Sequence, residues 1–116
     1  WVTSDLERAL YYEALPYTNK MYSCRFYRSF LQLASEVQCK DYLKNVSPKP
    51  PVLLMSGTHD MVGDKGAYAK EKAGILIENG FDVRLEIFDG MRHSILQEVQ
   101  RENVYRLIYE FIRENI

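Results

Sequence analysis

The chain has 116 residues, with 15 Lys and Arg against 16 Asp and Glu, which gives a formal net charge of -1. This length suits one domain at most, and 47% hydrophobic with 27% charged residues is typical of a folded protein rather than a disordered one. The near-neutral charge argues against a nucleic-acid partner. No apolar run reaches the roughly 18 residues that an integral membrane span requires.

Residues 1–46 are expected to be helical and are rich in aromatic side chains. A first helix is expected to open at Thr3 or Ser4, with Glu7 completing a capping box from Ser4. It should end before Leu15-Pro16, because the residue before a proline disfavours helical backbone.

A second helix is predicted over about Tyr22 to Leu43, where large apolar side chains recur at helical spacing: Phe26, Phe30, Leu33 and Val37. These side chains suit either core packing or contact with a substrate. Cys24 and Cys39 fall on the same pattern, so we expect buried free thiols rather than a disulfide or metal ligands. Free thiols favour a reducing compartment, and a cytoplasmic location is the default expectation.

Three prolines within Ser47–Pro51 mark the sharpest break in the chain, because they stop a helix and impose extended backbone. This break divides the chain into residues 1–46 and residues 47–116. The second part is expected to alternate strands and helices.

Val52–Met55 is a continuous apolar run, typical of a strand buried on both faces of a parallel sheet. A helix is expected from about Lys65 to Asn79, ended by Asn79-Gly80. Val83–Ile87 alternates apolar and charged residues, as in a strand with one wetter face near a sheet edge. A last helix carries an amphipathic stripe of Val104, Leu107, Ile108, Phe111 and Ile112.

Two strands joined by a helix should be parallel, and the first strand needs further neighbours for its backbone groups. The expected fold class is therefore α/β, with this chain as the trailing part of a larger α/β domain.

The residues that carry chemistry follow the two strands. His59, Asp60 and Asp64 come after the first strand, and Arg92 and His93 come after the second. Reactive residues of open α/β sheets gather at the carboxyl ends of strands, where a carboxylate can orient an imidazole and stabilise its protonated form. The residues alone leave another reading open, in which Asp60 terminates a turn and His93 caps a helix.

The segments Pro51–Asp64 and Phe88–His93 resemble the end of a serine α/β-hydrolase, closest to the lysophospholipase or monoacylglycerol-lipase-like group and its serine aminopeptidase relatives. The resemblance implies that Asp60 is the acid and His93 the base of a catalytic triad. It also implies that residues 1–46 are the end of a helical lid, and that residues 47–116 hold the last two core strands with their helices.

Three positions depart from the pattern of that group: Met61 replaces a common proline, Ser94 replaces a frequent glutamate, and Leu15 stands where an acidic residue often precedes Pro16. The remaining loop residues have ordinary roles open to them. Asp64 is expected to cap the following helix, His59 to lie on the loop surface, and Arg92 to be solvated.

The chain contains no Gly-x-Ser-x-Gly elbow to supply a nucleophile, and Ser56 is expected to be structural. The isolated chain should therefore be inactive. The parent enzyme would cleave a lipid-like acyl ester, such as a lysophospholipid or monoglyceride, without cofactor or metal. Its alternatives are a peptidase or acyltransferase of the same fold, or a non-catalytic binding or assembly fragment. The partners considered are the N-terminal part of the same hydrolase and a second copy of the chain.

Overall fold

The computed structural model describes residues 1–18, 20–37 and 40–116. Its helices and strands run in the order α1 (Leu6–Ala14), α2 (Cys24–Val37), β1 (Val52–Gly57), α3 (Ala67–Glu78), β2 (Val83–Phe88) and α4 (Arg101–Asn115). Short 3-10 turns cover Lys40–Asn45, Asp64–Gly66 and Ile95–Gln97. Among the described residues, no helix combines the length and the apolar character that crossing a membrane requires.

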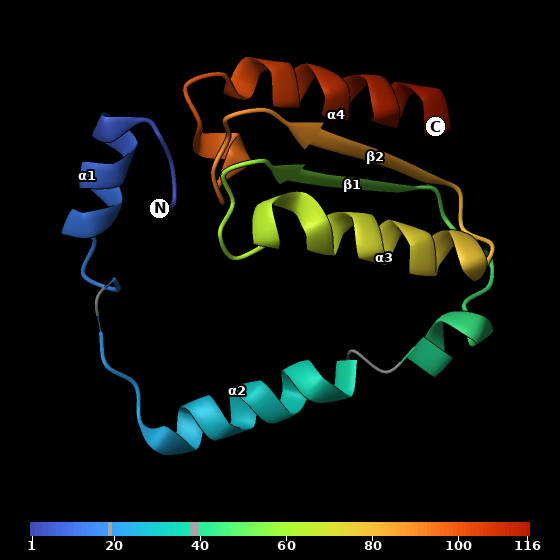
Figure 1. The fold of residues 1–116 in the computed structure, drawn as a ribbon, viewed down its shortest axis with the longest axis horizontal. Helices are drawn as coiled ribbons and strands as arrows, with labels where there is room; N and C mark the ends of the chain where they lie inside the picture. The colour runs from blue at the N-terminus through green and yellow to red at the C-terminus, as the bar shows by residue number, and fades with distance from the viewer. Residues whose placement is uncertain (19, 38–39) are drawn as a thin grey trace.

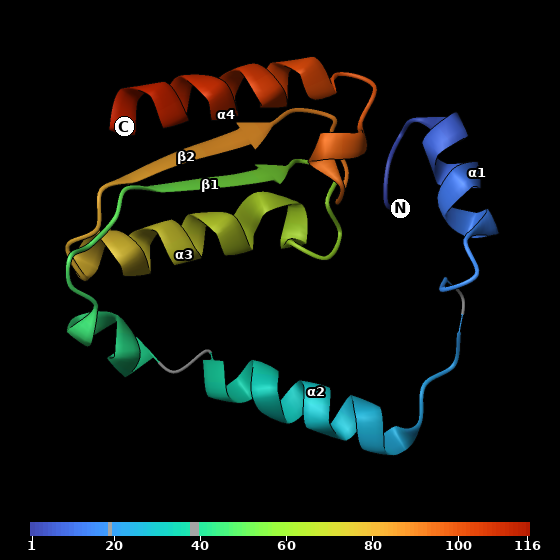
Figure 2. The ribbon, with the colours of Figure 1, turned by 180° about the vertical axis from the view of Figure 1, so that it is seen from behind.

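The two strands pair in parallel, in a register that runs from Val52 opposite Val83 to Gly57 opposite Phe88. Helices α3 and α4 lie on opposite sides of the strand pair (Figures 1 and 2), and α3 contacts both strands. The carboxyl ends of both strands point toward the N-terminal segment and α1 (Figure 1). The arrangement confirms the expected α/β class, with parallel strands joined by a helix.

The core is small and lies around the strands. Its buried apolar side chains are Ala73, Phe81, Met91, Val104 and Leu107. Two of them, Val104 and Leu107, belong to the stripe predicted for α4, whereas Ile112 at its far end is 47% exposed. The apolar stripe of α4 was therefore predicted at the correct positions, and only the first turns of the helix are buried in the core.

Two expectations for the strands are wrong. Val52–Met55 was expected to be buried on both faces, but these four residues are only half-buried. The reason is that β1 has one hydrogen-bonded neighbour among the described residues, so its other edge is open. Strand β2 was expected to alternate between a wet and a dry face, but it is half-buried along its whole length.

The helix ends follow local chemistry. Asp5, not Thr3 or Ser4, caps α1, since its side chain accepts a hydrogen bond from the Arg8 N–H, and α1 ends at Ala14 as expected. Helix α3 begins at Ala67 rather than near Lys65, because Lys65 has a φ of 55°. Gly80, with a φ of 80°, follows α3 as predicted.

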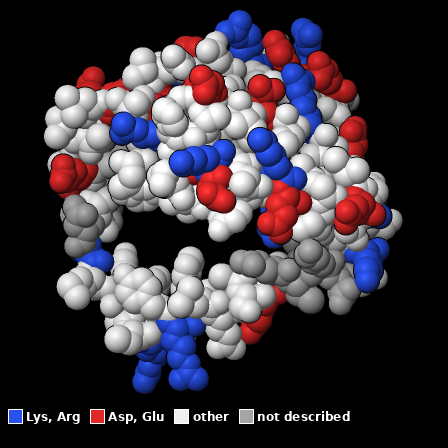
Figure 3. Space-filling view, viewed as in Figure 1, with Lys and Arg blue, Asp and Glu red and all other residues white. Residues whose placement is uncertain are grey.

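Helix α2 stands apart from the strands (Figures 1 and 2). It ends at Val37, and the predicted continuation to Leu43 is partly replaced by the 3-10 turn Lys40–Asn45. Its apolar stripe is exposed, with Phe26 at 46% and Phe30 at 57%. In the space-filling view, basic residues project from the outer side of α2, away from an open gap (Figure 3).

At Cys24 the expectation of a free thiol is confirmed and the expectation of burial is wrong. Cys24 is a free thiol but is exposed, because the described part of the chain packs nothing against the stripe of α2. Cys39 lies outside the described residues.

Candidate active site

The loops after β1 and β2 bring Asp60 and His93 together. The Nδ1 atom of His93 lies 3.0 Å from Oδ1 of Asp60. The Asp60 side chain is 9% exposed and the His93 side chain 41%. A nearly buried carboxylate thus holds one nitrogen of an imidazole that remains accessible from outside, which suits a base that must exchange protons with a bound molecule.

Gly57 allows the two loops to approach this closely. A Cβ atom at this position would lie 2.0 Å from the Met91 carbonyl oxygen, which is far inside van der Waals contact. That carbonyl oxygen accepts a hydrogen bond from the His59 N–H at 2.9 Å. The backbone after β1 can therefore lie directly against the backbone that carries His93.

Thr58 provides a second link between the loops. Its N–H donates to the Phe88 carbonyl at 2.9 Å, and its hydroxyl donates to Oδ1 of Asp89 at 3.0 Å. The same hydroxyl oxygen accepts from the Gly90 N–H at 2.8 Å. Together with Gly57, these bonds fix the separation of Asp60 and His93.

Asp60 also organises its own turn. Its Oδ1 accepts a hydrogen bond from the Val62 N–H at 3.0 Å, and its carbonyl accepts from the Lys65 N–H at 2.7 Å. A Cβ at Gly63 would lie 2.7 Å from Oδ2 of Asp60, so glycine leaves room for the carboxylate. Terminating a turn and orienting an imidazole, which the sequence left as alternatives, are both carried out by Asp60.

His93 caps neither of the helical segments that follow it. Ser94 stands at the N-cap of the turn Ile95–Gln97, and Gln100 at that of α4. The reading of His93 as a helix cap is therefore wrong.

The other sequence candidates lie outside the pair. His59 is exposed, as expected. Asp64 was expected to cap a helix, but the N-cap of α3 is Gly66, which has no side-chain hydrogen bond. Arg92 was expected to be solvated, but its Nη1 donates to the Thr3 carbonyl at 3.0 Å, because residues 1–5 lie against the histidine loop. Ser56 is 7% exposed, in keeping with the structural role expected for it.

Two residues near the site were not anticipated. The ring centroid of Trp1 lies 5.5 Å from that of His93 at an interplanar angle of 36°. Glu98 is 2% exposed and accepts hydrogen bonds from the N–H groups of Arg92 and Ser4. Ser4 and Glu98 are 94 positions apart, so no spacing rule in the sequence could have paired them.

Glu98 is ionised more readily than an ordinary glutamate. Burial alone would raise its pKa, but hydrogen bonds from the Ser4 hydroxyl and from the N–H groups of Arg92 and Ser4, with the charge of Arg92, outweigh burial and lower the pKa. A buried carboxylate with this set of donors is held in the charged form.

A cavity of about 580 Å³ lies between the N-terminal segment and α1 and reaches Arg92, the residue before His93. Its lining includes Trp1, Leu6, Ala9 and Tyr12 together with the polar Glu13 and Arg92. Within the described ranges, no group of three His, Cys, Asp or Glu side chains could hold a metal ion.

A parallel β-α-β unit with an acid after one strand and a histidine after the next is the arrangement of an α/β-hydrolase. The family model for serine aminopeptidase, S33, matches residues 1–100. The chain therefore belongs to this family of α/β-type hydrolases. A comparison with the curated proteins finds none that matches the chain.

Proposed function

We propose that this chain supplies the acid and the histidine of a serine-hydrolase triad. The observation that carries the proposal is the 3.0 Å contact between His93 Nδ1 and the nearly buried Asp60 carboxylate. This contact favours a proton on Nδ1 and leaves Nε2 as the basic nitrogen. Asp60 then holds the ring and stabilises the imidazolium that forms when Nε2 accepts a proton.

The nucleophile must come from outside this sequence, which has no Gly-x-Ser-x-Gly elbow. We infer that the preceding part of the same hydrolase supplies the serine and the oxyanion hole. In that arrangement residues 1–46 end a helical lid, and residues 47–116 complete the core. The open edge of β1 supports this inference, since one of its sides has no described neighbour.

The reaction proceeds through an acyl-enzyme. His93 takes the proton of the serine hydroxyl as the oxygen attacks the acyl carbonyl, and returns it to the leaving alcohol. It then takes a proton from water as the water oxygen attacks the acyl group, and it returns that proton to the serine oxygen as the acid is released. The isolated chain, lacking the serine, is expected to have no hydrolase activity.

An acyl ester with a lipid-like chain, such as a lysophospholipid or monoacylglycerol, is the proposed substrate. Apolar side chains of α1 line a cavity together with Trp1, whose ring lies 5.5 Å from that of His93, and ligand pockets are mostly apolar in this way. The exposed stripe of α2 adds further apolar surface.

Two alternatives have observations of their own. A peptidase is favoured by the aminopeptidase description of the matched family, and an acyltransferase would use the same acid and histidine. A panel of p-nitrophenyl esters against aminoacyl arylamides separates ester hydrolysis from peptidase activity. A non-catalytic assembly role is favoured by the open edge of β1 and the exposed face of α2.

The test compares the two histidines of the chain in the hydrolase that contains both this chain and the serine-bearing segment. His93→Ala should lower ester hydrolysis by at least about a thousand-fold, since the base is lost. His59→Ala removes an exposed ring from the neighbouring loop and should leave turnover within about two-fold of the parent. Turnover of His93→Ala within a few-fold of the parent would contradict the proposal.

A further inference from the structure

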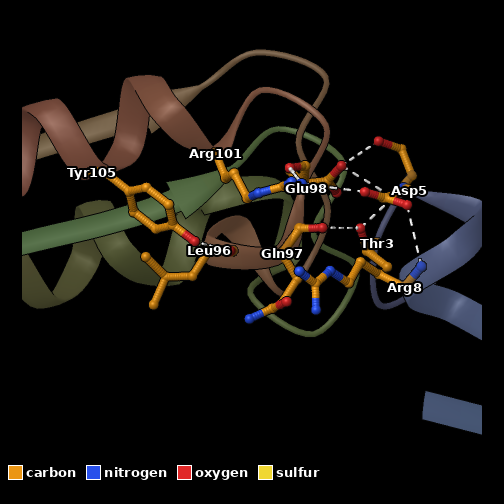
Figure 4. A network of polar contacts seen from close by, with 9 residues as sticks. Thr3, Asp5, Arg8, Leu96, Gln97, Glu98, Arg101 and Tyr105 are labelled. Carbon is orange, nitrogen blue, oxygen red and sulfur yellow. Dashed lines mark hydrogen bonds and ion pairs between the residues drawn. The ribbon is translucent and has the colours of Figure 1, made fainter. Parts of the chain in front are cut away.

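Glu98 joins two segments that are distant in the sequence. Its Oε1 accepts a hydrogen bond from the Arg92 N–H at 2.8 Å. Its Oε2 accepts from the Ser4 N–H at 3.0 Å and also from the Ser4 hydroxyl. Figure 4 shows Glu98 where the segment carrying Thr3 and Asp5 meets the loop carrying Leu96 and Gln97. A carboxylate this deeply buried is costly unless such donors surround it.

These contacts set the backbone on both sides of His93. The N–H before the histidine, that of Arg92, donates to Glu98. The N–H after it, that of Ser94, donates to the Val2 carbonyl at 2.8 Å. Neither Arg92 nor Ser94 lies in a helix or strand, so these two bonds, rather than regular secondary structure, orient the backbone at His93.

Glu98 accepts the first of these bonds and holds the segment that accepts the second. It binds Arg92 directly, and it binds Ser4, which fixes the chain two residues after Val2. Three further contacts dock the same N-terminal segment: Thr3 Oγ1 to the Gln97 carbonyl at 2.8 Å, Arg92 Nη1 to the Thr3 carbonyl at 3.0 Å, and Arg101 Nη1 to Asp5 Oδ2 at 3.2 Å.

We propose that Glu98 is a positioning residue for His93: it ties the backbone of the histidine loop to the segment that leads into α1, and so holds the imidazole against Asp60. The inference rests on the proposed function, because the setting of His93 affects catalysis only if His93 is the base. It also means that a displacement of residues 1–5 is transmitted to the histidine through Glu98.

The side-chain chemistry explains why a glutamate is needed. All three partners of Glu98 are donors, and an ionised carboxylate is an acceptor at both oxygens. Glu98→Gln keeps the size and shape but replaces one oxygen with an NH2 group, which then faces a donor. The substitution therefore breaks the hydrogen bonds of Glu98 either to Arg92 or to Ser4, and it leaves no cavity.

The experiment is amide hydrogen exchange, followed by NMR, on the full chain and two variants. In Glu98→Gln the amides of Arg92 and Ser94 should exchange about ten-fold faster or more, while those of β1 keep their wild-type rates. The matched control is Glu71→Gln, which changes an exposed glutamate of α3 and should leave all of these rates within about two-fold.

Two results would overturn the proposal. One is unchanged exchange at Arg92 and Ser94. The other is equal acceleration across the loop, β1 and α4, which is the signature of a residue that only stabilises the fold. If Glu98→Gln does not fold, Ser4→Ala replaces it: loss of the Ser4 hydroxyl should accelerate both amides about three-fold, and wild-type rates would overturn the proposal.

A second measurement separates this inference from the proposed function. In the hydrolase with its serine, Glu98→Gln should lower kcat roughly ten- to a hundred-fold with KM little changed, because substrate binding is kept and the base is misplaced. A local exchange response without ester hydrolysis by the wild type supports the positioning and counts against the proposed activity. Hydrolysis without an exchange response in the variant counts against the positioning alone.

Discussion

Gly57 is the residue on which the geometry of the site depends most directly. A Cβ at this position would lie 2.0 Å from the Met91 carbonyl oxygen, and the obstacle is backbone, which cannot move aside as a flexible side chain can. Gly57→Ala should therefore push the histidine loop away, break the hydrogen bond between His59 and Met91, and cost about 3 kcal/mol, near the upper end for overpacking.

Gly74 provides the matched control for this substitution. A Cβ at Gly74 meets nothing within 4 Å, and the residue lies inside α3, where alanine is favoured over glycine by about 1 kcal/mol. Urea unfolding should show Gly57→Ala destabilised and Gly74→Ala unchanged or stabilised. A Gly57→Ala variant as stable as the wild type would mean that the two loops do not lie in contact.

The ionisation of Glu98 predicts a dependence of stability on pH. Its pKa is lowered in the folded chain, so its contribution is fully present above the unfolded value and is lost as the pH falls through the folded value. An ordinary glutamate has a pKa of about 4.5, so the loss of stability should lie below that pH.

Thermal unfolding followed by circular dichroism from about pH 6 to about pH 3 measures this loss. The gap in Tm between the wild type and Glu98→Gln should narrow as the solution is acidified, since a protonated Glu98 makes the same number of hydrogen bonds to its donors as the amide does. A gap that is constant over the whole range would show that the charge of Glu98 contributes nothing.

At the scale of elements, α2 has the least partnered surface among the described helices. Phe26 and Phe30 are 46% and 57% exposed, and their rings stack with centroids 6.3 Å apart. Exposed apolar patches of this kind mark interaction sites or cause aggregation. We expect the isolated chain to self-associate through this face.

Charged residues on that face should weaken the association. Phe26→Glu with Phe30→Glu should shift the chain toward monomer in native mass spectrometry and sedimentation, under reducing conditions because Cys24 is exposed. Tyr109→Glu, a charge placed on a 64% exposed aromatic of α4, is the control and should leave the mass distribution unchanged. Association that persists in the double variant would place the contact elsewhere, at the open edge of β1 for example.

The helices and strands that could be predicted were those indicated by residues within the same segment of the sequence. Strand β1 was predicted from the continuous apolar run Val52–Met55, α4 from the period of its stripe, and the end of α1 from Leu15-Pro16, and these positions were correct. The start of α3 and the cap of α1 were wrong by one or two residues. Lys65 lies in a turn with a positive φ, and Ser4 is engaged by the distant Glu98, and neither feature has a signal in the local pattern.

For the whole molecule, burial was harder to predict than the elements. An apolar strand or helix stripe indicates which residues tend to be buried. It does not indicate whether the surface that covers them belongs to the same chain. Val52–Met55 was therefore expected to be fully buried and is only half-buried, and of the two roles left open for the stripe of α2, packing in the core of this chain is not observed. The Asp60–His93 contact could be predicted from the rule that parallel strands bring their carboxyl ends to one edge. The contacts of Glu98 with Ser4 and Arg92 could be found only from the folded structure.

The junction at Glu98 also has a consequence for the order in which the chain acquires its structure. Thr3 and Gln97 are hydrogen-bonded across 94 positions, and ribosomes add about 5–20 residues per second, so residues 1–5 wait on the order of 5 to 20 s for their partners to be synthesised. During that interval α1 has no folded surface to pack against, and its apolar residues remain accessible to chaperones. The contacts through which residues 1–5 hold the backbone at His93 therefore form only after the residues up to Glu98 have been synthesised.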